Sequence, residues 1–261
     1  MTNETVLADF DRQMRRQVAA DGPESRVERL ADIVRQVGPE HAWNGVLWSD
    51  LDEAGADEAI AAQVRYFTAL GREFEWKLYA HDRPADLAER LQAAGFDAEP
   101  PETLMVGRIA ELPTDAALPQ GVELLEVTDA AGVELVRRAH EQAFGDDGSW
   151  ICRRLLDQLA QEPDRVFAYV AMAGEQPVCA ARLELQPGTD FASLWGGGTA
   201  PEWRGRGIYR ALVAHRARIA AAHGYRYLQV DASDDSRPIL ARLGFQALTT
   251  TTPYLYRPPR P

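Results

Sequence analysis

A short run of arginine and glycine is the part of this sequence best suited to hold a charged ligand. Residues 204–209 read Arg-Gly-Arg-Gly-Ile-Tyr and follow a glycine triplet at residues 196–198. Gly205 and Gly207 let a ligand approach the backbone closely, because they lack a side chain. With Arg210, the run brings three arginines together in a chain whose net charge is −12. This combination predicts a site for the oxygens of a pyrophosphate.

The elements around this run are those that a phosphate site needs. Residues 191–198 predict a strand that ends in the glycines, and Ile208, Leu212 and Ile219 recur at helical spacing after Pro201. The N-terminus of that helix would present unpaired N–H groups and the positive end of the helix dipole to an anion. We therefore expect a strand, a loop and a helix to position the ligand together.

Two well-known phosphate loops fit the run less well. A P-loop needs a lysine after its last glycine, and Lys77 is the only lysine of the chain. A dinucleotide fingerprint needs three glycines, and Arg210 stands where the third would be. Asp231 at the next strand end could still take the role of its ribose-binding acid, so a dehydrogenase stays open as an alternative.

The rest of the chain predicts an α/β protein with two domains. Residues 111–121 contain two prolines and a glycine without an apolar period, which indicates a linker between domains at residues 1–110 and 119–261. In the second domain, Asp129 is placed to cap a helix and Gly224 to end one. Strands are predicted at residues 122–127, 166–172, 176–186, 191–198, 227–231 and 245–256, and helices at 129–144, 149–161, between Pro201 and Gly224, and at 238–243.

The first domain contains a second copy of one of these patterns. Residues 74–96 give a strand, an Arg-Pro pair, a helix and Gly-Phe, as residues 227–245 do, which indicates a duplicated unit. Earlier in this domain, helices are predicted at residues 4–19 and 25–37, the second with the capping-box spacing of Ser25 and Glu28. Residues 49–55, after a predicted strand, are acidic and would repel pyrophosphate, so we expect no coenzyme there.

The composition limits the partners. A net charge of −12 and a pI near 4.9 disfavour nucleic acid and anionic membrane surfaces. Neither a signal peptide nor a stretch of about 18 apolar residues is visible, so a cytoplasmic monomer or homodimer is expected. Cys152 and Cys179 belong to no cysteine or histidine cluster, which predicts two reduced, packed thiols and no metal site.

The Arg/Gly run and the segment downstream of it resemble the GNAT superfamily of acyl-CoA-dependent N-acyltransferases. The family loop reads Gln/Arg-x-x-Gly-x-Gly/Ala, and this chain departs from it only at Tyr209. Residues 233–245 are similar to its Asn-x-x-Ala-x-x-Leu-Tyr-x-x-x-Gly-Phe segment, and the resemblance covers residues 121–257. It implies a mixed-sheet GNAT fold with splayed central strands, in a tandem of two GNAT-like units of which the first is degenerate.

The resemblance also implies acetyl-CoA as the co-substrate and assigns residues to it. Main-chain groups at the strand end would pair with the pantetheine arm, and the amides of the loop would hold the pyrophosphate. Ser233 stands where the family has a coenzyme-contacting Asn. The implied coenzyme residues are Gly197, Gly198, Thr199, Arg204, Gly205, Arg206, Gly207, Ile208, Tyr209, Arg210 and Ser233.

The catalytic groups of the family are not evident in this sequence. Leu240 occupies the position of the usual tyrosine acid, and Ser193 or Trp195 that of the usual base. An attacking amine must be neutral, so a base is expected. The candidates are Glu184, Asp231 and Tyr254, each with the alternative of a solvated charge or a packed aromatic ring.

The acceptor side is indicated by an acidic turn. Asp146, Asp147 and Trp150 lie in a region that borders the acceptor site of the family, and would suit a cationic amine on a small molecule or peptide. An ordinary turn with Ser149 as helix N-cap is the alternative. The sequence thus predicts an N-acetyltransferase that acts by direct attack of a primary amine, with a non-catalytic acyl-CoA-binding or regulatory protein as the rival.

Overall fold

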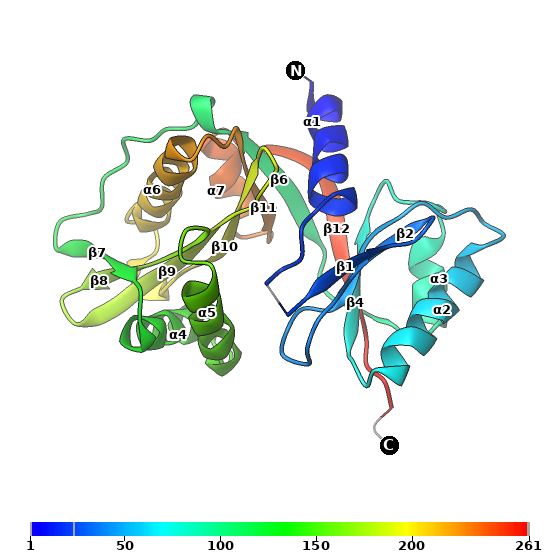
Figure 1. Ribbon diagram of the computed structural model, residues 1–261. Coiled ribbons are helices and arrows are strands. Elements are labelled where there is room, and N and C mark those ends of the chain that lie inside the picture. The colour runs from blue at the N-terminus through cyan, green and yellow to red at the C-terminus, as the bar shows by residue number, and fades with distance from the viewer. Residues whose placement is uncertain (1, 23, 260–261) are drawn as a thin grey trace. The chain divides into compact units, whose positions relative to one another are not determined.

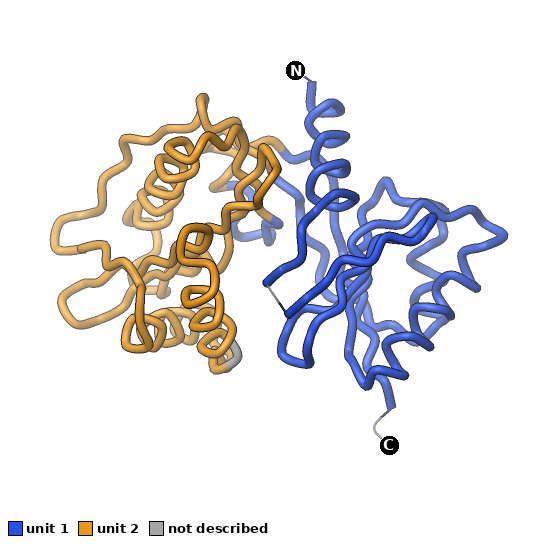
Figure 2. The backbone as a smooth tube through the Cα atoms, viewed as in Figure 1, with its two compact units in different colours: residues 1–105, 231–238, 247–261 blue, residues 106–230, 239–246 orange. Residues whose placement is uncertain are grey.

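The computed structural model describes residues 2–22 and 24–259, without the side chain of Trp150. The chain forms two compact units, shown in Figure 2. Unit 1 comprises residues 1–105, 231–238 and 247–261, and unit 2 comprises residues 106–230 and 239–246. The C-terminal segment belongs to unit 1 because its strand pairs with a strand of that unit, with Thr251 opposite Tyr79. The units therefore differ from the linear division at residues 111–121 that the sequence suggested.

Unit 2 is a sheet covered on both faces, with α4 and α5 on one face and α6 on the other (Figure 1). The strand order is β7-β8-β9-β10-β11, and all neighbours are antiparallel except β10 and β11, which α6 connects as a parallel pair. The last residues of β11 and the first of α7 are counted with unit 1. The elements of this unit are β7 (Val122–Val127), α4 (Ala130–Phe144), α5 (Ser149–Gln161), β8 (Val166–Ala173), β9 (Gln176–Leu185), β10 (Phe191–Thr199), α6 (Ile208–Ala222), β11 (Tyr227–Ala232) and α7 (Arg237–Arg242). The strand β6 (Glu102–Arg108) runs from unit 1 into unit 2, and β12 (Gln246–Tyr256) lies in unit 1 except for its first residue.

Strand alternation builds the two cores of unit 2. Val166, Ala168 and Val170 face α4 and α5, where Leu155 is 1% exposed. The intervening residues of β8 face α6 and pack against Ile208 and Leu212. Because successive side chains of a strand point to opposite faces, one apolar strand serves both layers.

The predicted elements of unit 2 are confirmed, including their end signals. The Asp129 side chain accepts a hydrogen bond from the Gly132 N–H (2.8 Å) at the start of α4. Gly224, with φ +82°, follows the end of α6. Such signals act within a few residues of the chain and need no tertiary contact.

Unit 1 has the same succession of elements in shorter form. Its strand order is β1-β2-β3-β4-β12, with β5 paired to β12, and α2 connects the parallel strands β3 and β4. Helices α2 and α3 pack on this sheet around Phe67, Phe74 and Leu91. The elements are α1 (Asn3–Phe10), a π-helix (Asp11–Arg16), β1 (Arg26–Arg29), β2 (Ile33–Val37), β3 (Gly45–Ser49), α2 (Ala56–Ala69), β4 (Phe74–Tyr79), α3 (Leu87–Ala93) and β5 (Asp97–Ala98).

The sequence repeat is a structural repeat. Helices α3 and α7 each end at a glycine with positive φ, Gly95 (+92°) and Gly244 (+101°). The N–H of the following phenylalanine then bonds back to a leucine carbonyl, Phe96 to Leu91 and Phe245 to Leu240, at 3.1 Å in both units. The two copies of the sequence repeat thus share the same helix ending.

One predicted element of unit 1 is wrong. Residues 25–37 form the hairpin of β1 and β2 rather than a helix, with Leu30 N–H bonded to the Ile33 carbonyl at 2.8 Å. Glu28 stands opposite Arg35 in the ladder and forms a 2.6 Å ion pair with it, so its spacing from Ser25 is not a capping box. The β-branched residues of this segment favour a strand.

Within the described residues, no helix combines the length and the apolar composition needed to cross a membrane.

Candidate functional site

The central strands of unit 2 separate beside the glycine triplet. The parallel ladder joins Phe191–Ser193 to residues 227–229, and its last pair is Ser193 with Gln229, whereas β10 continues to Thr199. On the other side, the register with β9 shifts between Trp195 and Gly198. The predicted splay of the central strands is thus present, and the last part of β10 offers main-chain groups on the side away from β9.

The Arg/Gly run forms a tight loop at the start of α6. Gly205 (φ +74°) and Gly207 (φ +86°) adopt the left-handed region, and Gly207 is the N-cap residue without a side-chain cap. The first N–H of this turn with a partner is that of Ala211, bonded to the Gly207 carbonyl at 3.0 Å. Across the described chain, no acceptor bonds the amides of residues 205–210. Unpaired N–H groups at a helix N-terminus attract anions.

Two of the three arginines here are available to an anion. Arg206 lies with its guanidinium 4.6 Å from the centre of the Trp203 ring, and Arg210 reaches back along Gly207. Among the described residues, neither has a carboxylate within 4.0 Å. Arg204 instead donates to the carbonyls of Thr199 (3.1 Å) and Ala143 (2.9 Å). It therefore ties the end of β10 to the end of α4 and positions the loop.

The departure at Tyr209 has a partner in the strand. A Cβ atom on Gly197 would lie 2.7 Å from Cε2 of Tyr209, so the ring occupies the space that a side chain at Gly197 would need. Burial raises the pKa of the Tyr209 hydroxyl. The aromatic ring and the glycine are thus complementary, which the loop pattern alone did not reveal.

A row of polar residues lies where the central strands part. Ser193 stands opposite Glu184 on β9 and Gln229 on β11. Gln229 Nε2 donates to the Ser193 hydroxyl at 2.7 Å, and Gln229 Oε1 is buried without a donor among the described residues. Sequence reasoning identified Glu184 and considered Ser193 but missed Gln229, whose one signal was a polar residue inside an apolar strand.

Glu184 has its own partners in this row. Its carboxylate lies 2.8 Å from Arg182 Nε and accepts from Gln158 Nε2 at 3.2 Å, and the residue is 8% exposed. Trp195, opposite Arg182 in the register, is 37% exposed. The row therefore offers a carboxylate, a hydroxyl and an amide oxygen that can accept hydrogen bonds from an amine, and of the three the carboxylate can take its proton.

Other predicted site residues lie in unit 1. Asp231 forms an ion pair with Lys77, and its other oxygen is buried without a donor in the described part of the chain. Tyr254 is 6% exposed in the core of that unit, and burial raises its pKa. The Ser233 hydroxyl lies 3.3 Å from that of Ser236. The structure thus brings neither Asp231, Tyr254 nor Ser233 into the unit that carries the loop.

The acidic turn before α5 is held by local bonds. Asp147 accepts from the N–H (2.9 Å) and the hydroxyl (2.8 Å) of Ser149, which lowers the pKa of its carboxyl. Asp146 lies 3.0 Å from Nε2 of His140. Both are exposed, and Trp150, in the first turn of α5, has its side chain outside the described residues. The nearby Phe144 is 56% exposed and lies against Gly198.

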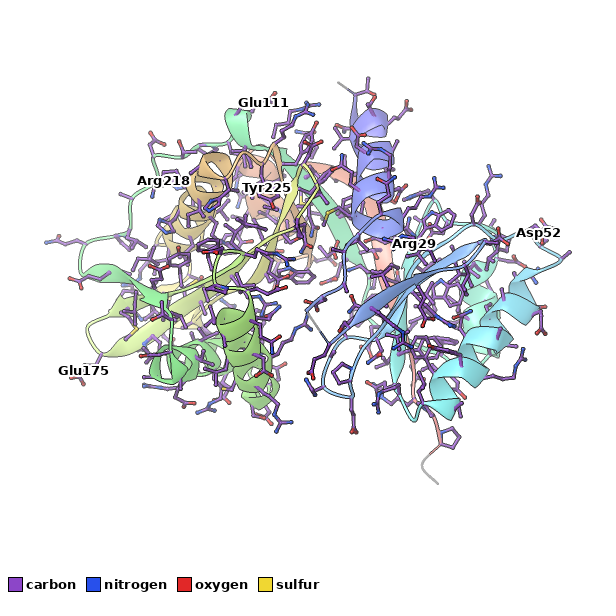
Figure 3. The ribbon with its side chains drawn as sticks, in the orientation of Figure 1. Arg29, Asp52, Glu111, Glu175, Arg218 and Tyr225 are labelled. Atoms are coloured by element: carbon purple, nitrogen blue, oxygen red, sulfur yellow. The ribbon has the colours of Figure 1, made fainter. Side chains whose placement is uncertain are left out.

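The corresponding loop of unit 1 is different. It connects β3 to α2, and Figure 3 labels Asp52 within it. The Asp52 carboxylate accepts from the Gly55 N–H at 2.7 Å, and its carbonyl accepts from the Ala56 N–H at 3.1 Å. The protein thus has a carboxylate next to the N-terminus of α2, where it would repel a phosphate.

Both cysteines are free thiols, Cys179 buried and Cys152 partly buried. Thr199 donates to Cys179 Sγ at 3.2 Å, and burial raises the pKa of this thiol to about 11. Burial likewise raises the pKa of Cys152. No group of three His, Cys, Asp or Glu side chains in the described ranges is arranged to hold a metal ion.

Comparison with solved structures shows the same fold over nearly the whole chain. A GCN5-related N-acetyltransferase from Kribbella flavida is 19% identical with a TM-score of 0.67, covering 97% of this chain and 93% of that one. A conserved protein of unknown function from Staphylococcus epidermidis is 15% identical (TM-score 0.69, 93% and 97% covered). A tandem GNAT protein from the clavulanic acid biosynthesis pathway is 14% identical (TM-score 0.61, 93% and 86% covered).

Sequence comparison points to the same family. No curated protein matches this chain. Residues 131–245, which contain the splayed strands, the Arg/Gly loop and the Gly-Phe segment, match the model of the acetyltransferase (GNAT) family. Residues 131–245 therefore match the acetyltransferase (GNAT) family, and the chain as a whole has the GNAT fold, as the tandem GNAT protein does.

Proposed function

We propose that unit 2 transfers an acetyl group from acetyl-CoA to a primary amine. One observation carries the proposal: the strands β10 and β11 part next to a loop of unpaired amides and two arginines without carboxylate partners among the described residues. A pyrophosphate on the loop would place the pantetheine arm along the end of β10. The main-chain groups there can bond its amides, and an N–H can stabilise the developing oxyanion.

The acceptor amine would approach on the face that carries the polar row. The neutral amine nitrogen attacks the thioester carbon, the carbon–sulfur bond breaks, and coenzyme A leaves as a thiolate. We propose that Glu184 takes the amine proton, relayed by the Ser193 hydroxyl or a water, while Gln229 Oε1 orients the nitrogen. A thiolate is a good leaving group near neutral pH, so the buried Leu240 in place of a tyrosine does not prevent turnover.

The surroundings favour a cationic acceptor. Phe144 and Trp195 are large aromatic side chains that unit 2 exposes, and Asp146 and Asp147 lie close to Phe144 in the chain. Aromatic faces and carboxylates attract ammonium groups. An ammonium group of the acceptor would bind there and then lose a proton, so that the neutral amine can attack. We propose a small amine or peptide as the acceptor.

A second candidate is an acyl-CoA-binding protein without catalysis. The specific observation in its favour is Leu240, which is fully buried at the position of the family's acid. It predicts binding of acetyl-CoA without thiol release.

The test is release of free thiol from acetyl-CoA across a panel of polyamines, aminoglycosides, amino acids and short peptides. Release that depends on one amine supports the transferase. Binding of acetyl-CoA with no release from any panel member favours the second candidate. The Arg206→Glu/Gly207→Glu double variant is the control and is expected to lose both binding and release.

A further inference from the structure

We propose that unit 1 binds a small organic anion in a hollow beside its N-terminal helix. The hollow has a volume of about 290 Å³, close to the lower end of small-molecule sites, roughly 300 Å³. It lies between the π-helix Asp11–Arg16 and the hairpin of β1 and β2. Its lining consists of Arg12, Arg16, Gln17, Arg29, Leu30 and Val34.

The three guanidinium groups of the hollow are held in place by other contacts. Arg29, labelled in Figure 3 beside the end of α1, donates to the carbonyls of Arg16 (2.9 Å) and Val18 (2.7 Å). The Arg16 guanidinium lies 4.7 Å from the centre of the Trp48 ring, and Arg12 forms a 2.6 Å ion pair with Asp9. Fixed side chains lose less conformational entropy when a ligand binds.

The charge of this lining contrasts with that of the chain. The six lining residues include three arginines and no acid, although the chain carries a net charge of −12. Asp9 neutralises Arg12 in part, whereas Arg16 has no carboxylate within 4.0 Å among the described residues. Guanidinium groups recognise carboxylate and phosphate oxygens with paired N–H bonds. The hollow therefore favours an anion.

Most of the surface that lines the hollow is apolar. Leu30 is 47% exposed there, one of the few large hydrophobic side chains that unit 1 leaves in solvent, and Val34 is buried next to the arginines. A ligand with a short hydrocarbon part would cover Leu30 while its anionic end meets Arg16. The combination indicates an amphiphilic anion, either a carboxylate or a phosphate ester.

The π-helix is an independent sign of function. Its turn is closed by the bond from Gln17 N–H to the Arg12 carbonyl at 3.0 Å, and π-helical turns are rare and concentrate at functional sites. It presents Arg12 and Arg16 to the hollow while Arg15, 2% exposed, points into the protein. The π-helical turn thus directs Arg15 into the protein and leaves Arg12 and Arg16 open to a ligand.

The test is calorimetric titration of the full chain with hexanoate and with hexyl phosphate, and with hexanol and hexylammonium as uncharged and cationic controls. We expect saturable binding of at least one anion, at least tenfold weaker for Arg16→Gln and for Leu30→Gln. Arg65→Gln, an exposed arginine elsewhere in unit 1, is the matched control and is expected to bind as the parent does. The preferred anion distinguishes a carboxylate ligand from a phosphate ester.

Several results would overturn the site. These are no saturable binding of either anion, equal binding of hexylammonium, or unchanged binding by both hollow variants. Loss of binding in Arg206→Glu/Gly207→Glu would place the anion on the α6 loop instead. The measurement on this loop variant distinguishes the hollow from the coenzyme site, so the anion site and the proposed transferase can be disproved independently.

Discussion

Arg15 donates from Nε to the main-chain oxygen of Leu47 at 3.0 Å. Leu47 lies on β3 just beyond the parallel ladder with β4, which ends at the pair Val46 and Trp76. The same guanidinium lies 4.0 Å from the centre of the ring of Tyr79 at the far end of β4. The side chain of Arg15 thus reaches both strands where they diverge. In unit 2, the corresponding gap between β10 and β11 is the place proposed for the pantetheine arm.

The contacts of Arg15 predict that its loss destabilises unit 1. Arg15 is 2% exposed and forms ion pairs with Asp11 (2.8 Å) and Asp82 (2.7 Å). Arg15→Met would leave Asp82, whose side chain is 4% exposed, without its cation, a change that costs about 3–5 kcal/mol. Urea unfolding measures this loss, with Arg65→Gln expected to cost less than about 1 kcal/mol. Equal and small effects of both substitutions would contradict the account.

Glu102 predicts a pH dependence of stability. Burial raises the pKa of Glu102 to about 7. The negative charges of Asp231 and Glu75 also raise this pKa, whereas the positive charge of Lys77 lowers it. The folded state then holds the proton more tightly than the unfolded chain, so this group lowers stability as pH rises from about 4.5 to above 7.

Glu102→Gln removes this effect. Because the side chain is partly exposed, we expect the variant to be more stable than the parent by about 1–3 kcal/mol near pH 8.5, and by little near pH 5. Urea unfolding at the two pH values measures the difference, and Glu58→Gln on the exposed face of α2 is the control. A gain that is the same at both pH values would show that Glu102 titrates normally.

The elements of unit 2 could be predicted because their signals are local. Asp129 bonds to an amide three residues on, and the glycines of the α6 loop need only their own φ angles. The hairpin of β1 and β2 could not be recognised, because Glu28 pairs with Arg35 only once the strands are in register.

The limits at the candidate site have the same origin. Asp231 suggested a base, yet its partner Lys77 is 154 residues away in sequence. Gln229 and Tyr209 acquire their roles from the neighbouring strand β10, through Ser193 and Gly197. The loop was predictable because one continuous segment forms it, and the polar row was not because three strands contribute to it.

The fit of Tyr209 against Gly197 predicts a coupled pair. Gly197→Ala places a methyl group against the largely buried ring and is expected to cost about 1–3 kcal/mol of unfolding free energy. In the double variant Gly197→Ala/Tyr209→Ala, the methyl group meets no ring, so the total cost is smaller than the sum of the single costs. A double-mutant cycle from urea unfolding measures a coupling of about 1 kcal/mol or more. Additive costs would mean that the two residues do not touch.

The polar row predicts a loss of turnover without a loss of coenzyme affinity. Glu184→Gln keeps the hydrogen-bonding shape but removes the base, so kcat is expected to fall by about 10²–10⁴-fold. The Kd for acetyl-CoA stays within about twofold of the parent. Glu123→Gln, exposed on β7, is the control for the loss of one negative charge. If kcat fell equally in the Glu184→Gln and Glu123→Gln variants, Glu184 would not be the base.

The most direct measurement is calorimetric titration of the full chain with acetyl-CoA. We expect one coenzyme to bind per parent chain and none to bind to the Arg206→Glu/Gly207→Glu variant. The Arg65→Glu control in unit 1 is expected to bind as the parent does. Circular dichroism checks that all three proteins are folded. Undiminished affinity in the loop variant, or a second coenzyme on the parent chain, would contradict the assignment of the coenzyme to the α6 loop of unit 2.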